Sequence, residues 1–443
     1  MHSASQIIEP ASLVPASPSL DVAPSRWTRI IPVALVMYTI AFVDRTNISL
    51  ALPRISRELH LDPQQVGTVA GIFFWGYLAL QIPGGHLAKH WSPKKFISVL
   101  LVAWSLFAVG CGLARTYHEL LVLRLLLGVA ESGVFPATLI LLSHWFSRAE
   151  RARANAMWLL CLPCAVILSS PFSGWMLDHW GWRVMLVAEG ALPLVWLAIW
   201  IAFIQDHPAE ARWLPPAERE SLVATLHAES IDLERSENVP YFRALMRPQV
   251  FVLAAIYFCF VRGQMVLLFW LPSATQNFRK LSSLHTGIVY TFPFIIGAIF
   301  LLIVARHSDK TRERRLHTAA AMGLGGTFIL LAVAVIPYSL FLAFAFIILS
   351  GVGAYGPMGP FWAIPTETLP AKTVGSVMGF VNAIGNLGAY FAPLIVGHLN
   401  KTTGSFLSGF AYLGAITVLG AAFCFLVKPA ASSIASSTVA DAG

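Results

Sequence analysis

The sequence predicts an all-α membrane protein of about twelve transmembrane helices, arranged in two six-helix halves. Three observations lead to this fold class. The 443 residues are 57% hydrophobic and only 12% charged, whereas soluble domains carry about 25% charged residues. Apolar segments close to the ~20 residues that cross a bilayer recur along the chain. A polar stretch in the middle separates six of these segments from six more.

These segments and the stretches between them divide the chain into five parts. Residues 1–28 and 429–443 are expected to be disordered cytoplasmic tails, because Ser and Ala are frequent in both. The N-terminal six-helix bundle is expected over 29–204, a central cytoplasmic loop over 205–248 and the C-terminal six-helix bundle over 249–428. Within the loop, 217–228 is expected to form a short helix on the membrane surface. The spans are expected near 30–52, 67–87, 96–114, 119–142, 154–177 and 183–204, and near 249–272, 284–305, 316–336, 339–363, 374–398 and 406–427.

Lys and Arg are concentrated in alternate turns, and this sets the expected orientation. If the N-terminus is cytoplasmic, the inner turns hold most of the basic residues, as the positive-inside rule requires. We therefore expect a multi-pass protein of a bacterial inner membrane with both termini in the cytoplasm. These turns also account for the net charge of +8, and no soluble module is long enough to bind nucleic acid.

Charged residues inside the expected spans are the strongest indication of function. A charge at the bilayer centre costs at least ~2.5–3.5 kcal/mol on insertion scales, so such residues usually face a cavity. Span 1 contains Asp44 and Arg45, and span 4 contains Arg124 and Glu131. At about 1.5 Å per residue, the two arginines lie at similar depth, roughly 10 Å from the outer helix ends. Glu131 follows Arg124 by about two turns, so it shares the same face and lies deeper.

These four residues fit the transport of an anion coupled to protons. Two arginines bind a carboxylate through forked hydrogen bonds, and a carboxyl group in a low dielectric can take up a proton near neutral pH. Glu131 is the better candidate proton carrier by depth, and Asp44 is the second. The alternative is that the charges only pair, Asp44 with Arg45 and Arg124 with Glu131, and hold the bundle together.

Two further intramembrane charges are weaker candidates. Glu189, near the outer end of span 6, is expected to pair locally, because charges at helix ends reach the interface at little cost. Arg262, beside Gln264 in the first helix of the second half, is roughly the counterpart of Arg45, and substrate contact and packing both stay open for it. Polar and aromatic side chains inside the spans could complete a site, although most intramembrane aromatics only pack: Tyr77, Trp362 and Asn382.

Three segments together resemble the anion:cation symporter family of the major facilitator superfamily. Residues 42–48, Phe-Val-Asp-Arg-Thr-Asn-Ile, resemble the family's aspartate-arginine-x-asparagine-isoleucine signature. Arg124 with 127–136, and Gly181-Trp-Arg followed by Glu189-Gly190, are similar to further family motifs. The resemblance covers nearly all of 28–428, and its motifs are specific as a set.

The resemblance implies the major-facilitator fold and proton-driven symport of organic anions into the cell by alternating access. Similar family members carry sugar acids, tartrate-like dicarboxylates, phthalate or other aromatic acids. It also implies that Asp44 and Glu131 are the proton-coupling residues. The substrate contacts that it implies are Arg45, Tyr77, Arg124, Gln264, Trp362 and Asn382.

The sequence departs from the superfamily pattern at two places. The turn after span 2 has Lys89 and His90 where the superfamily usually has aspartate-arginine, whereas the matching later turn keeps Asp309 and Lys310. The usual cytoplasmic gate pairing is therefore not expected in the first half. In span 5, residues 170–174 only partly resemble the motif of drug antiporters, which weakens an efflux interpretation.

Other function classes differ in what they require. An uncoupled organic-anion exchanger would keep the arginines and be indifferent to pH, and an aromatic-acid permease would use the same site. A drug antiporter would favour acids over arginines, and a membrane sensor would need a signalling domain. The sequence presents no metal-ligand cluster and no nucleophile–base set, so we expect no enzyme, cofactor or metal site. The expected partners are a small organic anion, protons and membrane lipid, and the protein is expected to be a monomer.

Overall fold

The computed structural model describes residues 24–81, 83–235, 243, 245–272, 282–368 and 371–427. Residues 1–23 of the expected N-terminal tail and all of the expected C-terminal tail, 429–443, lie outside these residues. The first group of helices is α1 Pro24–Glu58, α2 Pro63–Tyr77, α3 Pro83–His90, α4 Pro93–Leu113, α5 Tyr117–Ser132, α6 Val134–Trp145, α7 Arg148–Leu159, α8 Cys161–Gly190 and α9 Leu192–Phe203. The 3-10 turn η1 Pro208–Glu210 and the 20-residue helix α10 Pro216–Arg235 follow.

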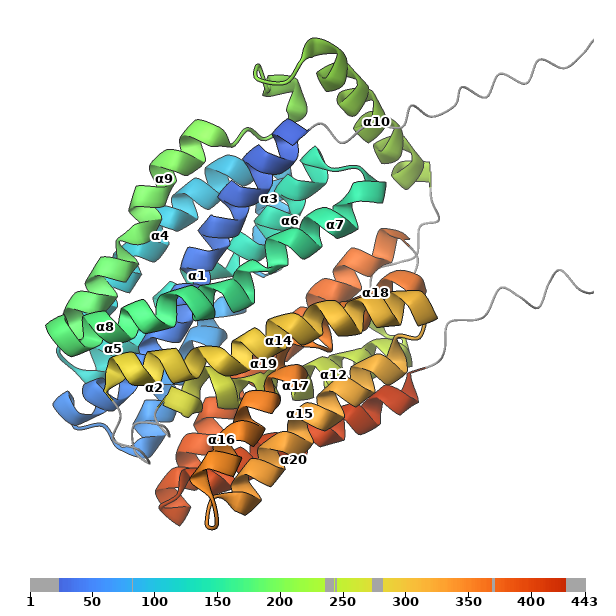
Figure 1. Ribbon diagram of the computed structural model, residues 1–443. Coiled ribbons are helices and arrows are strands. Elements are labelled where there is room, and N and C mark those ends of the chain that lie inside the picture. The colour runs from blue at the N-terminus through green and yellow to red at the C-terminus, as the bar shows by residue number, and fades with distance from the viewer. Residues whose placement is uncertain are drawn as a thin grey trace, which may run out of the picture.

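The second group of helices begins after α10. It is α12 Pro248–Met265, the π-helical turn η2 Val266–Trp270, α14 Ser283–Thr311, α15 Arg315–Val335, α16 Leu340–Leu349, α17 Gly351–Tyr355, α18 Met358–Thr368, α19 Ala371–Thr403, α20 Phe406–Phe423 and the 3-10 turn η3 Cys424–Leu426. In Figure 1 the helices before α10 form one bundle and those after it form another, while α10 lies beyond the end of the first bundle.

Ten helical runs in the described residues are long and apolar enough to cross a membrane. Two local breaks explain why this number differs from twelve. The run 153–203 turns at Gly181, whose φ of +79° suits glycine, and so holds the fifth and sixth expected spans. The second expected span is split into α2 and α3, because Pro83 has no N–H with which to continue a helix. The N–H of Leu80, freed by this break, donates to Ser132 Oγ at 3.0 Å.

Side-chain caps fix where several site-bearing helices begin. Asp62 accepts a hydrogen bond from the Gln65 N–H at 2.8 Å, and the Gln65 side chain accepts one from the Asp62 N–H at 3.0 Å. This reciprocal pair is a capping box at the start of α2. Ser92, Thr116 and Ser282 cap α4, α5 and α14 through single side-chain bonds.

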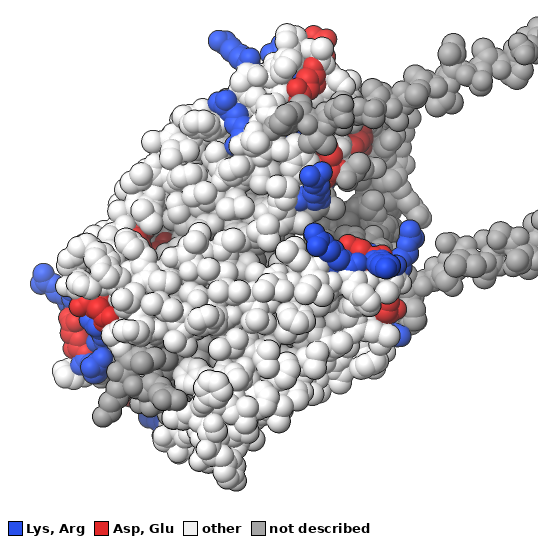
Figure 2. Space-filling model, in the orientation of Figure 1, with Lys and Arg blue, Asp and Glu red and all other residues white. Residues whose placement is uncertain are grey.

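The surface of the molecule is apolar where a membrane would cover it. Figure 2 shows few charged residues over the broad middle of one face and charges of both signs towards its ends. Leu106, Leu113 and Leu168, all on candidate spans, are 61%, 63% and 71% exposed. Such exposure is unfavourable in water and natural in lipid. The protein is therefore a multi-pass membrane protein.

The two bundles touch along two seams, one between α2 and α19 and one between α8 and α14. A Cβ atom added at Gly67 would lie 2.4 Å from the Pro393 carbonyl oxygen, and one at Gly174 would lie 2.4 Å from that of Ser283. Only glycine allows backbones to approach this closely. Because Gly67, Gly174 and Ser283 all lie near the α1–α2 turn and the α8 turn, we call this side of the molecule the closed end.

Polar contacts also join the bundles at the closed end. Asp178 on α8 accepts hydrogen bonds from the N–H groups of Ser283 at 3.1 Å and Leu284 at 2.8 Å, and so caps α14 from the other bundle. Arg54 on α1 donates to Asp178 at 2.7 Å. Lys401 on α19 donates to Asp62 at 3.0 Å. The closed end is thus sealed by both backbone packing and charge.

Candidate functional site

The two predicted arginines of the first bundle lie over one aromatic ring, that of Phe73 on α2. The guanidinium carbons of Arg45 and Arg124 are 5.3 Å and 5.0 Å from its centroid. The guanidinium of Arg45 is also 4.4 Å from the ring centroid of Tyr77. Both arginines are buried, at 6% and 1% exposure, and cation–π contact offsets part of the cost of burying their charge.

Close packing of α5 against α2 sets the position of Arg124. A Cβ atom at Gly128 would lie 2.0 Å from the Phe73 carbonyl oxygen, and one at Gly76 would lie 2.2 Å from that of Leu125. Two glycines therefore let the backbones touch. Because Arg124 stands one turn before Gly128, this contact brings its guanidinium over the ring of Phe73.

Glu131 is the ionic partner of Arg45. The Nε of Arg45 donates to Oε2 of Glu131 at 3.0 Å, and Glu131 is fully buried. Within the described part of the chain, four buried atoms of this cluster have no hydrogen-bond partner: Oε1 of Glu131, Nη2 of Arg45, and Nε and Nη2 of Arg124. Since buried polar atoms are nearly always satisfied, these free nitrogens indicate a place where a polar ligand can bind.

The Asp44 carboxylate faces α4 and not the adjacent Arg45. Its Oδ2 accepts from Trp104 Nε1 at 2.5 Å, and its Oδ1 accepts from Asn47 Nδ2 at 3.3 Å. Arg124 reaches only the backbone carbonyl of Asp44, at 3.3 Å. The described contacts thus contain neither of the pairs considered from the sequence, Asp44 with Arg45 and Arg124 with Glu131. Adjacent helical residues point about 100° apart, which separates Asp44 from Arg45.

The second bundle contributes the other three predicted residues. Gln264, in the last turn of α12, donates to the carbonyl oxygen of Ala354. Trp362 on α18 packs edge-on against Tyr257, with centroids 4.8 Å apart. Asn382 on α19 donates to Oε1 of Gln81 at 3.2 Å and so contacts the first bundle. The interruption of α12 by η2 beside Gln264 is notable because π-helical turns are frequent at functional sites.

Sequence reasoning missed several residues that shape this site. The hydroxyl of Tyr38 lies 3.3 Å from that of Tyr77, and its ring centroid is 5.8 Å from the guanidinium of Arg45. Tyr38 precedes Arg45 by seven residues, so helical periodicity alone places both on one face. Phe73 precedes Tyr77 by four residues on the same face. Trp104 gave no such signal, because nothing in its own helix distinguishes it from the other apolar residues.

The two weaker candidates lie in different surroundings. Arg262 donates to the Tyr412 hydroxyl at 2.6 Å and lies 4.1 Å from the ring centroid of Phe258, so its described contacts are within the second bundle. Glu189 does not pair with nearby Arg183, which binds Glu58 at 2.9 Å. The expectation of a local ion pair for Glu189 was therefore wrong, and this carboxyl group is 3% exposed.

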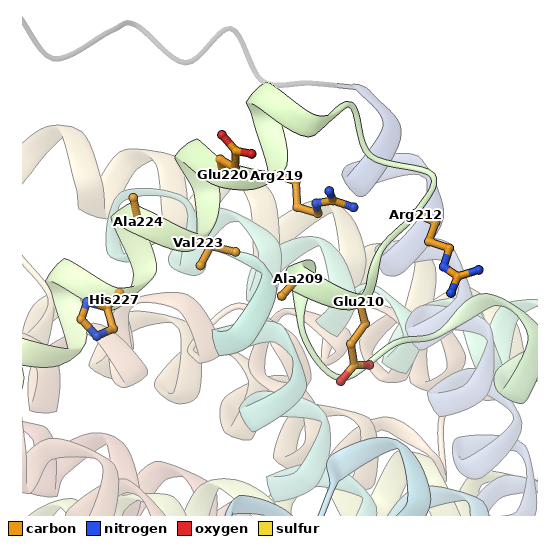
Figure 3. Close-up of a pocket in the computed structure, with 8 residues that line it drawn as sticks. All are labelled: Ala209, Glu210, Arg212, Arg219, Glu220, Val223, Ala224 and His227. Carbon is orange, nitrogen blue, oxygen red and sulfur yellow. The ribbon is translucent and has the colours of Figure 1, made fainter.

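A surface cleft lies apart from these residues, between η1 and α10. Figure 3 shows Glu210, Arg212, Arg219, Glu220 and His227 around it. Its volume is about 850 Å³, and none of the predicted site residues lines it. Among the described residues, no group of three or more His, Cys, Asp or Glu is placed to hold a metal ion.

Comparison with known proteins identifies the family to which this fold belongs. The model of the Major Facilitator Superfamily matches residues 34–393. The chain belongs to this superfamily. Its members are transporters, so the protein is a membrane transporter and not an enzyme. The family assignment agrees with the twelve-span, two-bundle fold predicted from the sequence.

Similar proteins extend over nearly the whole transporter. The Agrobacterium vitis protein named "Putative tartrate transporter" is 31% identical over 399 residues, covering 89% of this chain and 91% of that one. The Bacillus subtilis protein named "Probable galactarate/D-glucarate transporter GudP" is 26% identical over 443 residues, covering 95% of each. A quinolone resistance transporter of Acinetobacter baumannii is 26% identical over 418 residues, covering 92% and 95%.

Solved structures share the fold at low sequence identity. The inward open xylose transporter XylE from E. coli has a TM-score of 0.74 at 15% identity, covering 92% of this chain and 98% of that one. A bacterial homolog of the human lysosomal transporter Spinster, inward-facing and occupied, has a TM-score of 0.70 at 19% identity, covering 90% and 96%. These matches show the major-facilitator fold.

Proposed function

We propose that this transporter takes up a small organic anion, such as a sugar acid or dicarboxylate, together with protons by alternating access. One observation carries the proposal: Arg45 and Arg124 lie buried over Phe73 with three guanidinium nitrogens that have no partner in the described residues. An uncoupled organic-anion exchanger or an aromatic-acid permease is the second candidate. The rings of Tyr38, Phe73 and Tyr77 around Arg45 favour an aromatic acid.

A carboxylate is the ligand chemistry that suits the free nitrogens. A guanidinium binds a carboxylate through two parallel hydrogen bonds, and two guanidinium groups over one ring suit a dianion or a hydroxylated acid. Two relatives carry tartrate and galactarate or glucarate in their names, and all of these are dicarboxylates. A cationic drug would meet uncompensated positive charge here. The remaining proposed substrate contacts are Tyr77, Gln264, Trp362 and Asn382.

Glu131 provides a physical route for coupling to protons. It occupies Nε of Arg45, the group that a substrate carboxylate would also bind. A proton on Glu131 removes its charge, which weakens the ion pair and frees Arg45 for the anion. An anion bound to Arg45 leaves Glu131 without a counter-charge, and a buried carboxylate in that state favours a proton. Either order brings anion and proton in together, and Asp44 is the second proposed proton carrier.

Alternating access would act through the two seams. We assign the closed end to the outer side of a bacterial inner membrane, because this orientation places most Lys and Arg on the inner side. In this proposal the bundles 29–204 and 249–428 rotate about the site, the loop 205–248 and both tails are cytoplasmic, and the protein works as a monomer.

Counterflow in proteoliposomes tests the substrate class. Vesicles containing the purified transporter are loaded with tartrate, D-glucarate, benzoate or a quinolone, and entry of the same labelled compound is measured. We expect exchange of at least one carboxylate, its loss in Arg124→Ala, and its retention in Arg115→Ala, an exposed arginine. Exchange of the quinolone alone, or carboxylate exchange that survives Arg124→Ala, would contradict the proposal.

A further inference from the structure

A third buried carboxyl group, that of Glu189, lies next to the Asp44 network. Oε1 of Glu189 accepts from Ser173 Oγ at 2.5 Å, and its Oε2 accepts from Asn47 Nδ2 at 2.8 Å. Ser173 and Glu189 stand eight residues on either side of Gly181, at which α8 folds back. The hairpin thus brings the two side chains together inside the bundle, and only 3% of Glu189 is exposed.

Glu189 differs from Glu131 in having no cation beside it. Within the described residues it makes no ion pair, and both of its hydrogen bonds come from neutral groups. A charged carboxylate that loses its hydration without gaining a counter-charge is costly, and protonation removes that cost. A carboxyl group in this setting is therefore suited to gain and lose a proton, and needs a function to justify its burial.

Asn47 joins Glu189 to Asp44. The amide nitrogen of Asn47 donates to Oδ1 of Asp44 at 3.3 Å and to Oε2 of Glu189 at 2.8 Å. An amide NH₂ has two N–H groups, so one Asn can serve both carboxyls. Two carboxylates held by one nitrogen repel each other, and a proton on either one relieves the repulsion.

The other helices packed against α8 bring no competing charge to Glu189. On α4, Trp104 donates to Asp44, and Ser105 donates to the Gly190 carbonyl at 2.6 Å. On α14, the hydroxyl of Tyr290 donates to the Leu268 carbonyl at 2.7 Å. Helix α9 contains no charged residue. Among the described residues, Asp44 on α1 is thus the titratable group that faces Glu189.

We propose that Glu189 is a positioning residue for proton coupling, which shares one negative charge with Asp44 through the Asn47 amide. This inference rests on the proposed proton-coupled function, because it assigns Glu189 a part in setting when Asp44 is protonated. In the coupled cycle a proton from the outer solution binds to Asp44 while Glu189 carries the remaining negative charge, and the same proton leaves to the inner solution. Glu189 touches neither the substrate arginines nor Glu131 in the described contacts, so it acts through Asp44.

The pH profile of gradient-driven uptake tests this role. In proteoliposomes, Glu189→Gln should shift the pH of half-maximal uptake towards acid by about one unit, because Asp44 loses its negative neighbour. Counterflow at fixed pH should persist, since the arginine site is unchanged. Glu189→Asp retains an ionisable group and should restore a profile close to that of the unmodified protein. Glu119→Gln, on an exposed side chain, is the matched control.

The outcomes separate this inference from the proposed function. Uptake by the unmodified protein that ignores pH would overturn the proposed coupling itself. Coupled uptake with identical profiles for the unmodified protein and Glu189→Gln would overturn the role of Glu189 alone. If Glu189→Gln does not fold, Ser173→Ala, which removes one donor to the carboxylate, decides instead: a smaller acid shift supports the inference, and an unchanged profile overturns it.

Discussion

At the scale of single residues, the proposed coupling depends on an exchange of partners at Arg45. Glu131 holds Nε of Arg45 while Nη2 has no partner in the described residues. Glu131→Gln keeps the shape but cannot carry the proton. We expect it to abolish accumulation driven by a pH gradient while counterflow of the same anion continues, because Arg45 remains able to bind a carboxylate. Normal gradient-driven accumulation in Glu131→Gln would show that another acid couples transport.

The fork of Arg45 gives a second prediction at this scale. Arg45→Lys keeps the charge but replaces two directed donors with a point charge. Losing one charge-assisted hydrogen bond costs about 1.5–3 kcal/mol, so binding should weaken by roughly 10- to 100-fold. Isothermal titration with the transported anion measures this change. Arg115→Lys, which changes an exposed side chain, should bind the anion with normal affinity. Unchanged affinity in Arg45→Lys would exclude Arg45 from the binding site.

The sequence identifies the charged candidate residues more readily than it predicts their partners. Asp44, Arg45, Arg124 and Glu131 were identifiable because a charge in a membrane span is costly. The pairing of Arg45 with Glu131 was not, since it depends on how α1 faces α5. The bond from Asn47 to Glu189 joins residues 142 positions apart and depends on the α8 hairpin.

At the scale of helices, the contact between α2 and α5 holds Arg124 over Phe73 in the candidate site. Gly128→Ala would put a Cβ atom 2.0 Å from the Phe73 carbonyl oxygen. The two helices must then separate, and the guanidinium of Arg124 must move away from the ring of Phe73. We expect a lower melting temperature in detergent and loss of anion binding. Gly379→Ala is the matched control, because no atom lies within 4 Å of its added Cβ. Equal behaviour of the two variants would show that this helix contact is not required.

Helix types and rough bounds follow from composition, and the breaks follow from local chemistry. The helix α2 ends at Tyr77 and Pro83 is the first residue of α3, although an unbroken span over 67–87 was expected. The turn at Leu80 is stable because Ser132, 52 residues later, accepts its N–H. Such long-range partners have no local signal. The helix expected over 217–228 extends over Pro216–Arg235, because Glu and Leu, which recur after 228, are also good helix formers.

At the scale of the whole molecule, Asp178 is the main polar link across the closed end. It binds Arg54 in its own bundle and caps α14 of the other. Asp178→Asn removes the negative charge that accepts three hydrogen bonds, two of them from α14, so the closed end should open more often. Spin labels on His60→Cys and Thr402→Cys, which lie on opposite bundles, should report a larger population of long distances. Glu58→Gln breaks an ion pair within one bundle and should leave the distances between the spin labels unchanged. If Glu58→Gln lengthened these distances as much as Asp178→Asn, a specific role for Asp178 would be contradicted.

The second link across the closed end, Lys401 with Asp62, is not expected to sense pH during uptake. The backbone N–H of Gln65, followed by Lys401, lowers the pKa of the Asp62 carboxyl from its usual value. A lowered pKa means that the stabilisation is present above the ordinary pKa of Asp and is lost only as pH falls below it. Lys401→Ala should therefore leave the pH profile of uptake unchanged between pH 5 and about 8. A shifted profile would place part of the coupling at the closed end.

Transport driven by an imposed pH gradient is the direct test of proton coupling. Proteoliposomes with the unmodified protein are given an acidic outer solution and a neutral interior, and uptake of the anion identified by counterflow is followed. If protons drive uptake, the anion accumulates above its outside concentration, and this accumulation collapses when a protonophore dissipates the gradient and is lost in Glu131→Gln. Equal uptake with and without the gradient would contradict proton coupling and leave anion exchange as the function.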